Sequence, residues 1–324
     1  MNDTERFSIS ECDNAGVYEI VVKNNETKEY AIIIPESGAR LKELNLSNGQ
    51  SNLSVLKKVI DIKSRERDAV FTNAKLSPFA GRIKDGTYEF NDVKYSLPLN
   101  YAEESNACHG LVYDKKFEIV NSETQKDYAK CTLRYNYNGD NEGYPFEYSI
   151  DLTYKLTAEN GLICLTQIKN NSDEMIPISD GWHHYFDLGL KVDDLKLNLS
   201  TCREIELDDR NTPAGALKNF DDFSLPGRIG DRKFDSCFKL QQNGNTAVTK
   251  LISEELDLVL NIWQETGDNK YGYCLIYTPP GRKSIAIEPM TSNVDSFNNG
   301  EGLIKLKPGE QFESMFGIYL SRVN

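Results

Sequence analysis

The sequence predicts an all-β protein, organised as one large antiparallel β domain over residues 1–324. Three observations carry this prediction. Apolar and polar residues alternate with a period of two in segments from one end of the chain to the other. The 17 Tyr and 14 Phe are residue types that favour strands over helices. In addition, no Gly/Ser/Pro linker, internal repeat or low-complexity tract divides the chain.

The first predicted elements lie in the N-terminal third of the chain. Residues 52–63 form the one segment whose pattern suggests a helix. A β-hairpin is then predicted from two alternating stretches, 88–90 and 93–97. The pair Asn91-Asp92 between them is typical of a tight turn.

The clearest strands lie in the middle of the chain. Apolar side chains alternate over 146–156, the pair Asn160-Gly161 supplies a turn, and 162–168 runs back, which predicts a second hairpin. Shorter alternating or apolar stretches predict four further strands, over 175–178, 195–199, 256–262 and 312–320.

The charge balance excludes several classes of partner. The chain has 37 Lys+Arg against 50 Asp+Glu, which gives a formal net charge of −13. Because this excess repels phosphate backbones and anionic lipid surfaces, we expect no nucleic-acid binding and no membrane association. The longest apolar runs, such as 31–35, are far shorter than the roughly 20 residues that a membrane helix needs.

The cysteines and the N-terminus favour a cytoplasmic location. The first ten residues, MNDTERFSIS, are charged where a secretory signal would be apolar. The seven cysteines are odd in number, widely spaced and without a C-x-x-C pair. We therefore expect them to be reduced and mostly buried, with neither a disulfide framework nor a structural zinc site.

Imidazole chemistry is confined to three histidines, His109, His183 and His184. His183 and His184 follow the predicted strand 175–178. If their own segment is also extended, adjacent side chains face opposite sides, so only one of the two can point into a given pocket. The alternative is that one of them packs beside Trp182 as a hydrogen-bonded core residue.

Two other clusters carry candidate functional residues. His109 is followed by Gly110, and Arg82 is preceded by Gly81. A glycine in such a place allows close approach of the backbone to a ligand, but a tight turn requires the same residue. Glu288 interrupts an apolar strand, which is costly without a partner and often functional. The alternative is that Glu288 lies in solvent at the strand end.

Other common site chemistries are not supported. The histidines lack the H-x-H or H-E-x-x-H spacing of metal ligands, so we expect no metal. No G-x-S-x-G elbow is present, and no cysteine has a context that argues for activation. No G-x-G-x-x-G or Walker loop is present, so no nucleotide cofactor is expected.

Five short motifs, taken in order, resemble the aldose 1-epimerase (mutarotase) family. They are FAGRI at 79–83 with DGTY at 85–88, the box from Asn106 to Gly110, HHYFDL at 183–188, FDSCF at 234–238 and IAIEP at 285–289. The resemblance implies a galactose-mutarotase-like supersandwich, a large antiparallel β-sandwich, as a single domain over residues 1–324. It also implies an isomerase that interconverts the α and β anomers of a free aldohexose without a cofactor.

The resemblance assigns roles to five residues. His183 stands at the family's general acid and Glu288 at its general base. Arg82 and His109 match positions that hold sugar oxygens near the anomeric centre, and Asp235 matches an acidic residue that binds sugar hydroxyls. Mutarotation removes a proton from the anomeric hydroxyl while the ring oxygen gains one, so a carboxylate and an imidazolium suffice. We expect the two on opposite sides of one pyranose.

The chain departs from the family pattern at three positions, one of which is Leu275, where some relatives carry a polar residue. The other two adjoin Arg82 and His183. Gly81 stands where many members have Asn, which removes one side-chain contact to the sugar. Trp182 replaces a polar residue and is available to stack on a sugar face. These changes leave the acid and the base in place.

Two alternative functions remain open. One is a non-catalytic carbohydrate-binding β-sandwich, although a pure binder need not keep an acid and base pair. The other is a mutarotase for a phosphorylated hexose, which would need several Arg or Lys around the phosphate. Lys75 and Lys84 lie near Arg82, but no wider basic cluster exists, so this alternative ranks below the free sugar. No pattern indicates an oligomeric state.

Overall fold

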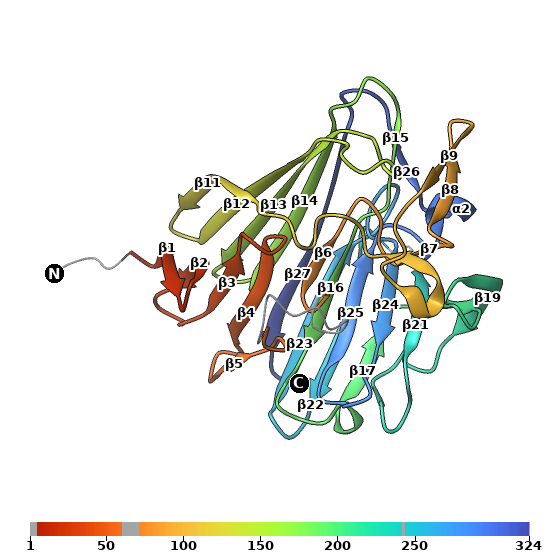
Figure 1. Cartoon of the computed structure of the whole chain (residues 1–324). Coiled ribbons are helices and arrows are strands. Elements are labelled where there is room, and N and C mark those ends of the chain that lie inside the picture. The colour runs from red at the N-terminus through yellow and green to blue at the C-terminus, as the bar shows by residue number, and fades with distance from the viewer. Residues whose placement is uncertain (1–4, 60–70, 242–243, 324) are drawn as a thin grey trace.

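The computed structural model describes residues 5–59, 71–241 and 244–323, and strands dominate these ranges (Figure 1). The described residues contain one short α-helix, α2 (Ser296–Asn299), and two 3-10 helices, η1 (Ala102–Glu104) and η2 (Val192–Asp194). All pairings between the named strands are antiparallel. The prediction of an all-β, antiparallel protein is therefore confirmed.

The largest sheet has nine strands and joins the middle of the chain to its C-terminus. In spatial order its strands are β11 (Glu118–Thr124), β12 (Tyr128–Tyr137), β13 (Tyr148–Thr157), β14 (Leu162–Asn170), β27 (Gln311–Ser321), β23 (Leu258–Glu265), β22 (Thr246–Ser253), β17 (Lys196–Leu199) and β20 (Gly227–Arg228). The C-terminal strand β27 lies between β14 and β23, so it joins the strands of residues 118–170 to those of residues 196–265.

A seven-stranded sheet carries most of the candidate site residues. In spatial order it contains β19 (Pro213–Phe220), β18 (Cys202–Leu207), β21 (Asp235–Leu240), β24 (Tyr273–Tyr277), β25 (Ile285–Met290), β16 (Gly181–Phe186) and β6 (Ala74–Leu76). One face of this sheet packs on the nine-stranded sheet. Trp182 lies with its ring centroid 5.9 Å from Tyr154 of β13 and 5.5 Å from Phe316 of β27. The two sheets thus form a sandwich.

Within the described ranges, four smaller sheets accompany this sandwich. A five-stranded meander comprises β1 (Phe7–Asn14), β2 (Val17–Asn24), β3 (Tyr30–Ile34), β4 (Arg40–Ser47) and β5 (Asn52–Ser54). Its strand β2 contacts β12 and β13, and β4 contacts β27. Three two-stranded sheets pair β7 (Arg82–Lys84) with β10 (Asn106–Cys108), β8 (Thr87–Phe90) with β9 (Val93–Ser96), and β15 (Ile176–Ile178) with β26 (Ile304–Leu306).

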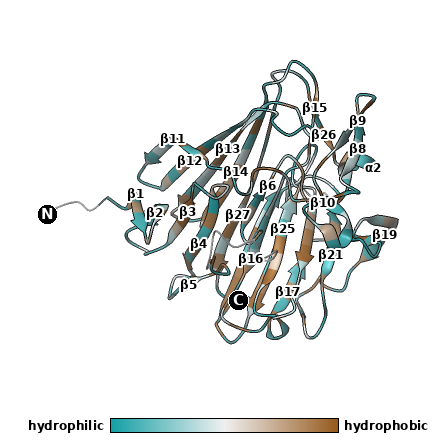
Figure 2. Ribbon diagram, viewed as in Figure 1, coloured by the Kyte–Doolittle hydropathy of each residue, from teal (hydrophilic) through white to brown (hydrophobic). Residues whose placement is uncertain are grey.

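One hydrophobic core connects these sheets. It runs from Phe7 on β1 to Leu320 on β27 and includes side chains of all the larger sheets. Figure 2 shows that apolar residues concentrate on the strands, while the connecting loops are mostly hydrophilic. Alternating burial, such as the pattern of β13 in which every second side chain is fully enclosed, produces this core as the sequence periodicity predicts.

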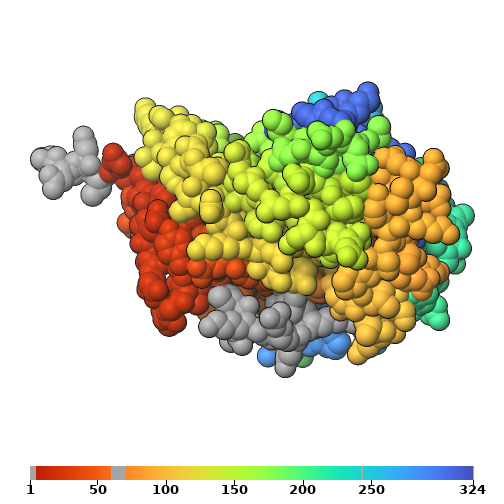
Figure 3. Space-filling model, turned by 45° about the horizontal axis from the view of Figure 1, so that its top comes forward, coloured from red at the N-terminus to blue at the C-terminus, as the bar shows by residue number. Residues whose placement is uncertain are grey.

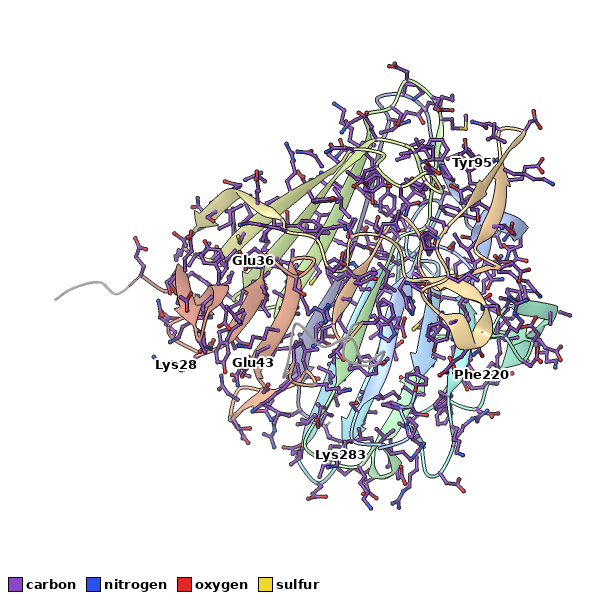
Figure 4. The ribbon with its side chains drawn as sticks, viewed as in Figure 1. Lys28, Glu36, Glu43, Tyr95, Phe220 and Lys283 are labelled. Carbon is purple, nitrogen blue, oxygen red and sulfur yellow. The ribbon has the colours of Figure 1, made fainter. Side chains whose placement is uncertain are left out.

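Different regions of the chain occupy opposite ends of the molecule. In Figure 3 the N-terminal strands occupy one end, and residues near 75–110 occupy the opposite end. Figure 4 shows the same separation for labelled residues: Lys28 and Glu43 lie on the side of the five-stranded sheet, and Tyr95 and Phe220 lie on the far side.

Most predicted strands are present, with small shifts at their ends. The hairpin predicted at 88–97 is β8 and β9, and its turn residues Asn91 and Asp92 both have positive φ, 51° and 62°. The hairpin predicted at 146–168 is β13 and β14, with Leu156 opposite Leu162. The four shorter predictions correspond to β15, β17, β23 and β27.

The helix predicted over residues 52–63 is wrong where the structure describes it. Residues Asn52–Ser54 form β5, which pairs with β4, and Leu56 makes an isolated bridge to Phe186. Residues 60–63 lie outside the described residues. The apolar spacing here resembles that of a helix, but pairing with distant strands supplies the backbone hydrogen bonds instead.

The cysteines form no disulfide, as expected: six are buried and Cys12 is exposed. Within the ranges 5–59, 71–241 and 244–323, no helix has the length and apolar character needed to cross a membrane.

Candidate active site

A pocket opens on the face of the seven-stranded sheet that points away from the core. It encloses about 430 Å³ of empty space, its open mouth included. Its lining residues are Phe71, Arg82, Tyr101, His109, His183, Tyr185, Asp235, Leu275, Tyr277 and Glu288. All five residues singled out from the sequence therefore line one pocket, although they are spread over more than 200 positions.

Strand alternation decides which histidine reaches the pocket. On β16, His183 and Tyr185 line the pocket with their rings stacked, 4.8 Å between centroids. The rings of Trp182 and His184 stack on the opposite, core face at 5.4 Å. The prediction that the two adjacent histidines face opposite sides is thus confirmed.

The expectation that Trp182 stacks on a sugar face is wrong. Its side chain is buried on the core side of β16, where its indole Nε1 donates a hydrogen bond to the hydroxyl of Tyr271 at 3.0 Å. Because the residue before His183 must point away from the pocket when the strand is extended, an aromatic residue there serves the core.

His183 and Glu288 meet at the base of the pocket. They lie on neighbouring strands, β16 and β25, and His183 Nε2 is 3.3 Å from Glu288 Oε1. The side chains are therefore in direct contact, which corrects the expectation that a sugar ring would separate them. The anomeric hydroxyl and the ring oxygen are bonded to the same carbon, so an adjacent acid and base can reach both oxygens.

Burial makes Glu288 a stronger base than an ordinary carboxylate. Its side chain is 1% exposed, and this burial raises its pKa well above the usual 4.5. The charge of Asp235 raises the pKa further, while the charge of Arg82 opposes the rise. Its oxygen Oε2 has no hydrogen-bond partner among the described residues. A buried carboxylate with an unused oxygen beside a pocket is poised to exchange a proton.

We expect Glu288→Gln to stabilise the fold, and more so at neutral than at acid pH. The folded-state pKa of Glu288 lies above its ordinary value. The glutamate therefore contributes stability below the unfolded-state pKa, and this contribution is lost as pH rises through the folded-state pKa. Glutamine does not titrate. Thermal denaturation at about pH 4 and about pH 8 should show a melting-temperature advantage of the variant that widens with pH; a constant advantage would contradict the raised pKa.

Arg82 is held at the pocket wall by a carboxylate that sequence reasoning did not find. Glu104, at the end of η1, accepts hydrogen bonds from Arg82 Nε at 2.5 Å and from Arg82 Nη2 at 3.2 Å. Asn211 donates to the same carboxylate at 2.9 Å, and Arg210 Nε donates to the Glu104 carbonyl at 2.8 Å. The bidentate pair fixes the plane of the guanidinium. Nothing in the local sequence around Glu104 indicates this contact.

A tight backbone crossing places His109. Its amide donates to the carbonyl of Gly81 at 2.9 Å, and its own φ is +65°. The next residue, Gly110, has φ +78° and makes a parallel bridge to Ser77. A Cβ atom on Gly110 would lie 2.2 Å from the Ser77 carbonyl oxygen. Gly110 therefore serves as the residue of a tight turn and also allows two backbone segments to approach closely. Together these features position His109 at the pocket.

We expect Gly110→Ala to destabilise the protein by about 2–4 kcal/mol, because it combines an unfavourable positive φ with a backbone clash. Gly309→Ala is the matched control. Gly309 has nearly the same φ, +77°, but a Cβ there meets no atom within 4 Å. The control should cost only about 1 kcal/mol. Urea denaturation of both variants measures the difference, and equal losses would show that the contact with Ser77 does not matter.

Asp235 and a set of aromatic side chains complete the pocket. Asp235 begins β21 and pairs in register with Tyr277 of β24. The ring of Tyr277 lies 6.3 Å from that of Tyr185, and Phe71 packs on His109 at 4.7 Å. Sequence reasoning missed these aromatic residues. Tyr185 could have been found, since it lies two residues after His183 on the same strand and so shares its face.

The two lysines considered for a phosphate partner have other partners in the structure. Lys75 is fully buried and pairs with Asp180. Lys84 pairs with Asp208 at 3.0 Å. Neither lines the pocket. Among the residues that the structure describes, no group of three or more His, Cys, Asp or Glu side chains is arranged to hold a metal ion.

Known proteins share both this fold and this sequence pattern. A galactose mutarotase-like protein from Clostridium acetobutylicum superposes with a TM-score of 0.86 at 23% identity, covering 99% of this chain and all of that one. An aldose 1-epimerase of Streptococcus thermophilus is 24% identical over 247 residues, 71% of this chain and 69% of its own. A maltose epimerase of Levilactobacillus brevis is 23% identical over 254 residues, covering 72% and 73%.

The fold and the motifs therefore define the class. The chain has the galactose mutarotase-like fold, with the predicted acid and base positions in one pocket. The sequence model of the family described as "Aldose 1-epimerase" matches residues 19–319 of this chain. The chain belongs to the aldose 1-epimerase family and is an isomerase that acts on sugars.

Proposed function

We propose that this protein interconverts the α and β anomers of a free aldohexose, with Glu288 as general base and His183 as general acid. The observation that carries the proposal is the contact between these two side chains, 3.3 Å from Nε2 to Oε1, on the wall of a pocket. Burial raises the pKa of Glu288, which suits proton abstraction from a weakly acidic hydroxyl.

The reaction moves two protons and breaks one bond. Glu288 takes the proton of the anomeric hydroxyl while protonated His183 gives its Nε2 proton to the ring oxygen. The bond between the anomeric carbon and the ring oxygen breaks, and the anomeric carbon becomes an aldehyde. Rotation about the adjacent carbon–carbon bond presents the other aldehyde face. Ring closure returns each proton to its donor, so neither residue is consumed.

Three further residues are proposed to hold the sugar. Arg82 and His109 would stabilise negative charge that develops on oxygen when the ring opens, because both can donate hydrogen bonds. Arg82 is supported in this role by its rigid attachment to Glu104. Asp235, which also lines the pocket, would accept hydrogen bonds from sugar hydroxyls.

The proposal extends to substrate class and setting. The relatives are named for an aldose and for maltose, which supports a neutral sugar as substrate without choosing between sugars. The salt bridges of Lys75 and Lys84 outside the pocket lining give a phosphorylated hexose no support. The continuous core supports treating residues 1–324 as one domain, and the unpaired cysteines support a cytoplasmic location.

Polarimetry tests this function. Freshly dissolved α-anomers of glucose, galactose, xylose and maltose are mixed with the protein, and the approach of optical rotation to equilibrium is compared with buffer alone. Acceleration that scales with protein concentration supports the proposal. Saturable sugar binding without acceleration would instead indicate the non-catalytic carbohydrate-binding alternative.

A further inference from the structure

An ion pair lies inside the protein directly behind the candidate catalytic strand. Lys75 of β6 and Asp180, the residue before β16, both have side chains that are 0% exposed. Lys75 Nζ is 2.5 Å from Asp180 Oδ2 and also donates to the Gly181 carbonyl at 2.9 Å. The ammonium lies 4.6 Å from the centroid of the Trp182 ring. The pair is on the core face of the sheet, so it touches no group in the pocket.

Asp180 is the centre of a wider network. The Tyr271 hydroxyl donates to Asp180 Oδ2 at 2.8 Å and accepts from Trp182 Nε1 at 3.0 Å. The backbone of Asp180 is also engaged: its amide donates to Thr291 Oγ1, and its carbonyl accepts from the Thr291 amide, both at 2.9 Å. Tyr271 precedes β24 and Thr291 follows β25. The Asp180 carboxylate contacts Lys75 of β6 and Tyr271 before β24, and the Asp180 backbone contacts Thr291 after β25.

The network bears on the geometry of His183 and Glu288. In the register of β6 with β16, Lys75 lies opposite Trp182 and Ala74 lies opposite His183. Glu288 lies three residues before Thr291 on β25. The side chains of Lys75 and Asp180 therefore fasten β16 to β6 and to the segment that leads into β24, within three residues of His183. β16 carries His183, and β25, which pairs with β24, carries Glu288. A shift of either strand would change the distance between His183 Nε2 and Glu288 Oε1.

The ion pair is expensive for the fold. Desolvation lowers the pKa of Lys75 to about 8 and raises that of Asp180. Replacing a buried ion pair with neutral side chains of similar volume is often neutral or even stabilising, whereas removing one partner leaves an uncompensated charge. A contribution to stability is therefore a weak explanation for the presence of this ion pair. Its position behind His183 and Glu288 suggests a role in the active site instead.

We propose that Lys75 and Asp180 are positioning residues, which hold β16 against β6 and the segment before β24, in the position that brings His183 Nε2 against Glu288 Oε1. This inference rests on the proposed mutarotase function. It concerns the relative position of the His183 and Glu288 side chains rather than contact with the sugar. Displacements near 1 Å can cost about 100-fold in rate, so the pair should affect turnover much more than substrate binding.

The test is the charge-free double variant Lys75→Met/Asp180→Asn. We expect it to melt within a few degrees of the wild type, because no charge is left unpaired. We expect kcat for mutarotation to fall about 10- to 100-fold while KM changes less than about twofold. A folded double variant with wild-type kcat would overturn the proposal. A loss confined to KM would do the same, since it would indicate substrate binding.

A milder variant keeps the test informative if the double variant does not fold. Tyr271→Phe keeps the ring but removes the hydroxyl that donates to Asp180 and accepts from Trp182 Nε1. We expect kcat to fall about three- to tenfold, and unchanged kcat would contradict the proposal. The matched control is Lys42→Met/Glu19→Gln. This pair joins a buried Glu to a partly buried Lys on the five-stranded sheet, outside the pocket lining. It should leave kcat unchanged.

A second measurement separates failure of this inference from failure of the proposed function. Because the chain has only three histidines, the imidazole signals can be followed by NMR during a pH titration. Loosening its contact with Glu288 should change the chemical shifts of the His183 imidazole in the double variant relative to the wild type. If wild-type protein accelerates no sugar, the function fails. If the His183 imidazole signals of the double variant match those of the wild type, the inference fails.

Discussion

Glu288→Gln is expected to lower kcat for mutarotation by about 10²- to 10⁴-fold, the range that general acid–base catalysis supplies. Gln matches Glu in size but cannot accept the proton of the anomeric hydroxyl. Because the pocket shape is retained, KM should change little. The measurement is polarimetry with saturating α-anomer of whichever sugar the wild type equilibrates fastest. This effect is larger than any that we expect outside the pair of His183 and Glu288.

The control for Glu288 is another buried glutamate. Glu19 is 2% exposed on β2 and does not line the pocket, so Glu19→Gln should keep kcat within about twofold of wild type. If Glu288→Gln retains most of its activity while remaining folded, Glu288 is not the base. In that case Asp235, the other carboxylate of the pocket lining, becomes the residue to test.

His183→Asn should cause a loss of similar size, about 10²- to 10⁴-fold in kcat. Asparagine can donate a hydrogen bond to the ring oxygen but cannot transfer a proton to it. The loss should therefore persist at every pH at which the protein is folded. Activity measured by polarimetry between about pH 5 and about pH 9 checks this expectation; activity that recovers at either extreme would argue against His183 as the acid.

The adjacent histidine supplies the control for His183. His184 is fully buried on the core face, its burial lowers its pKa to about 3, and neither ring nitrogen has a hydrogen-bond partner among the described residues. Replacing His184 with Leu removes two buried nitrogens that form no hydrogen bond among the described residues. His184→Leu should therefore fold and keep kcat within a few fold of wild type. A large loss in His184→Leu together with an active His183→Asn would reverse the assignment of the two histidines.

Local patterns predicted the strands well because the alternation of apolar and polar residues in a strand can be recognised from adjacent residues. The hairpin of β13 and β14 and the turn at Asn91-Asp92 both follow from alternation and turn chemistry. Residues 52–54 show the limit of this reasoning. Their strand β5 exists because β4 lies alongside, and a neighbour of that kind cannot be read from the segment itself.

The candidate site shows the same division. Family motifs named Arg82, His109, His183, Asp235 and Glu288, and the structure brings all five to one pocket. Alternation also separated His183 from His184. Glu104 and Tyr277 were missed, since no local motif specifies that Glu104 reaches Arg82 from η1 or that Tyr277 reaches the pocket from β24.

The sequence by itself determined the all-β class, most of the strands and the face of β16 on which each histidine lies. These features depend on backbone geometry within a few residues, which local composition controls. Only the tertiary structure decided the contact of His183 with Glu288 and the pairing of Lys75 with Asp180. Each of these pairs joins strands about one hundred residues apart. Their distances depend on strand order and register, which the packing of the whole core sets.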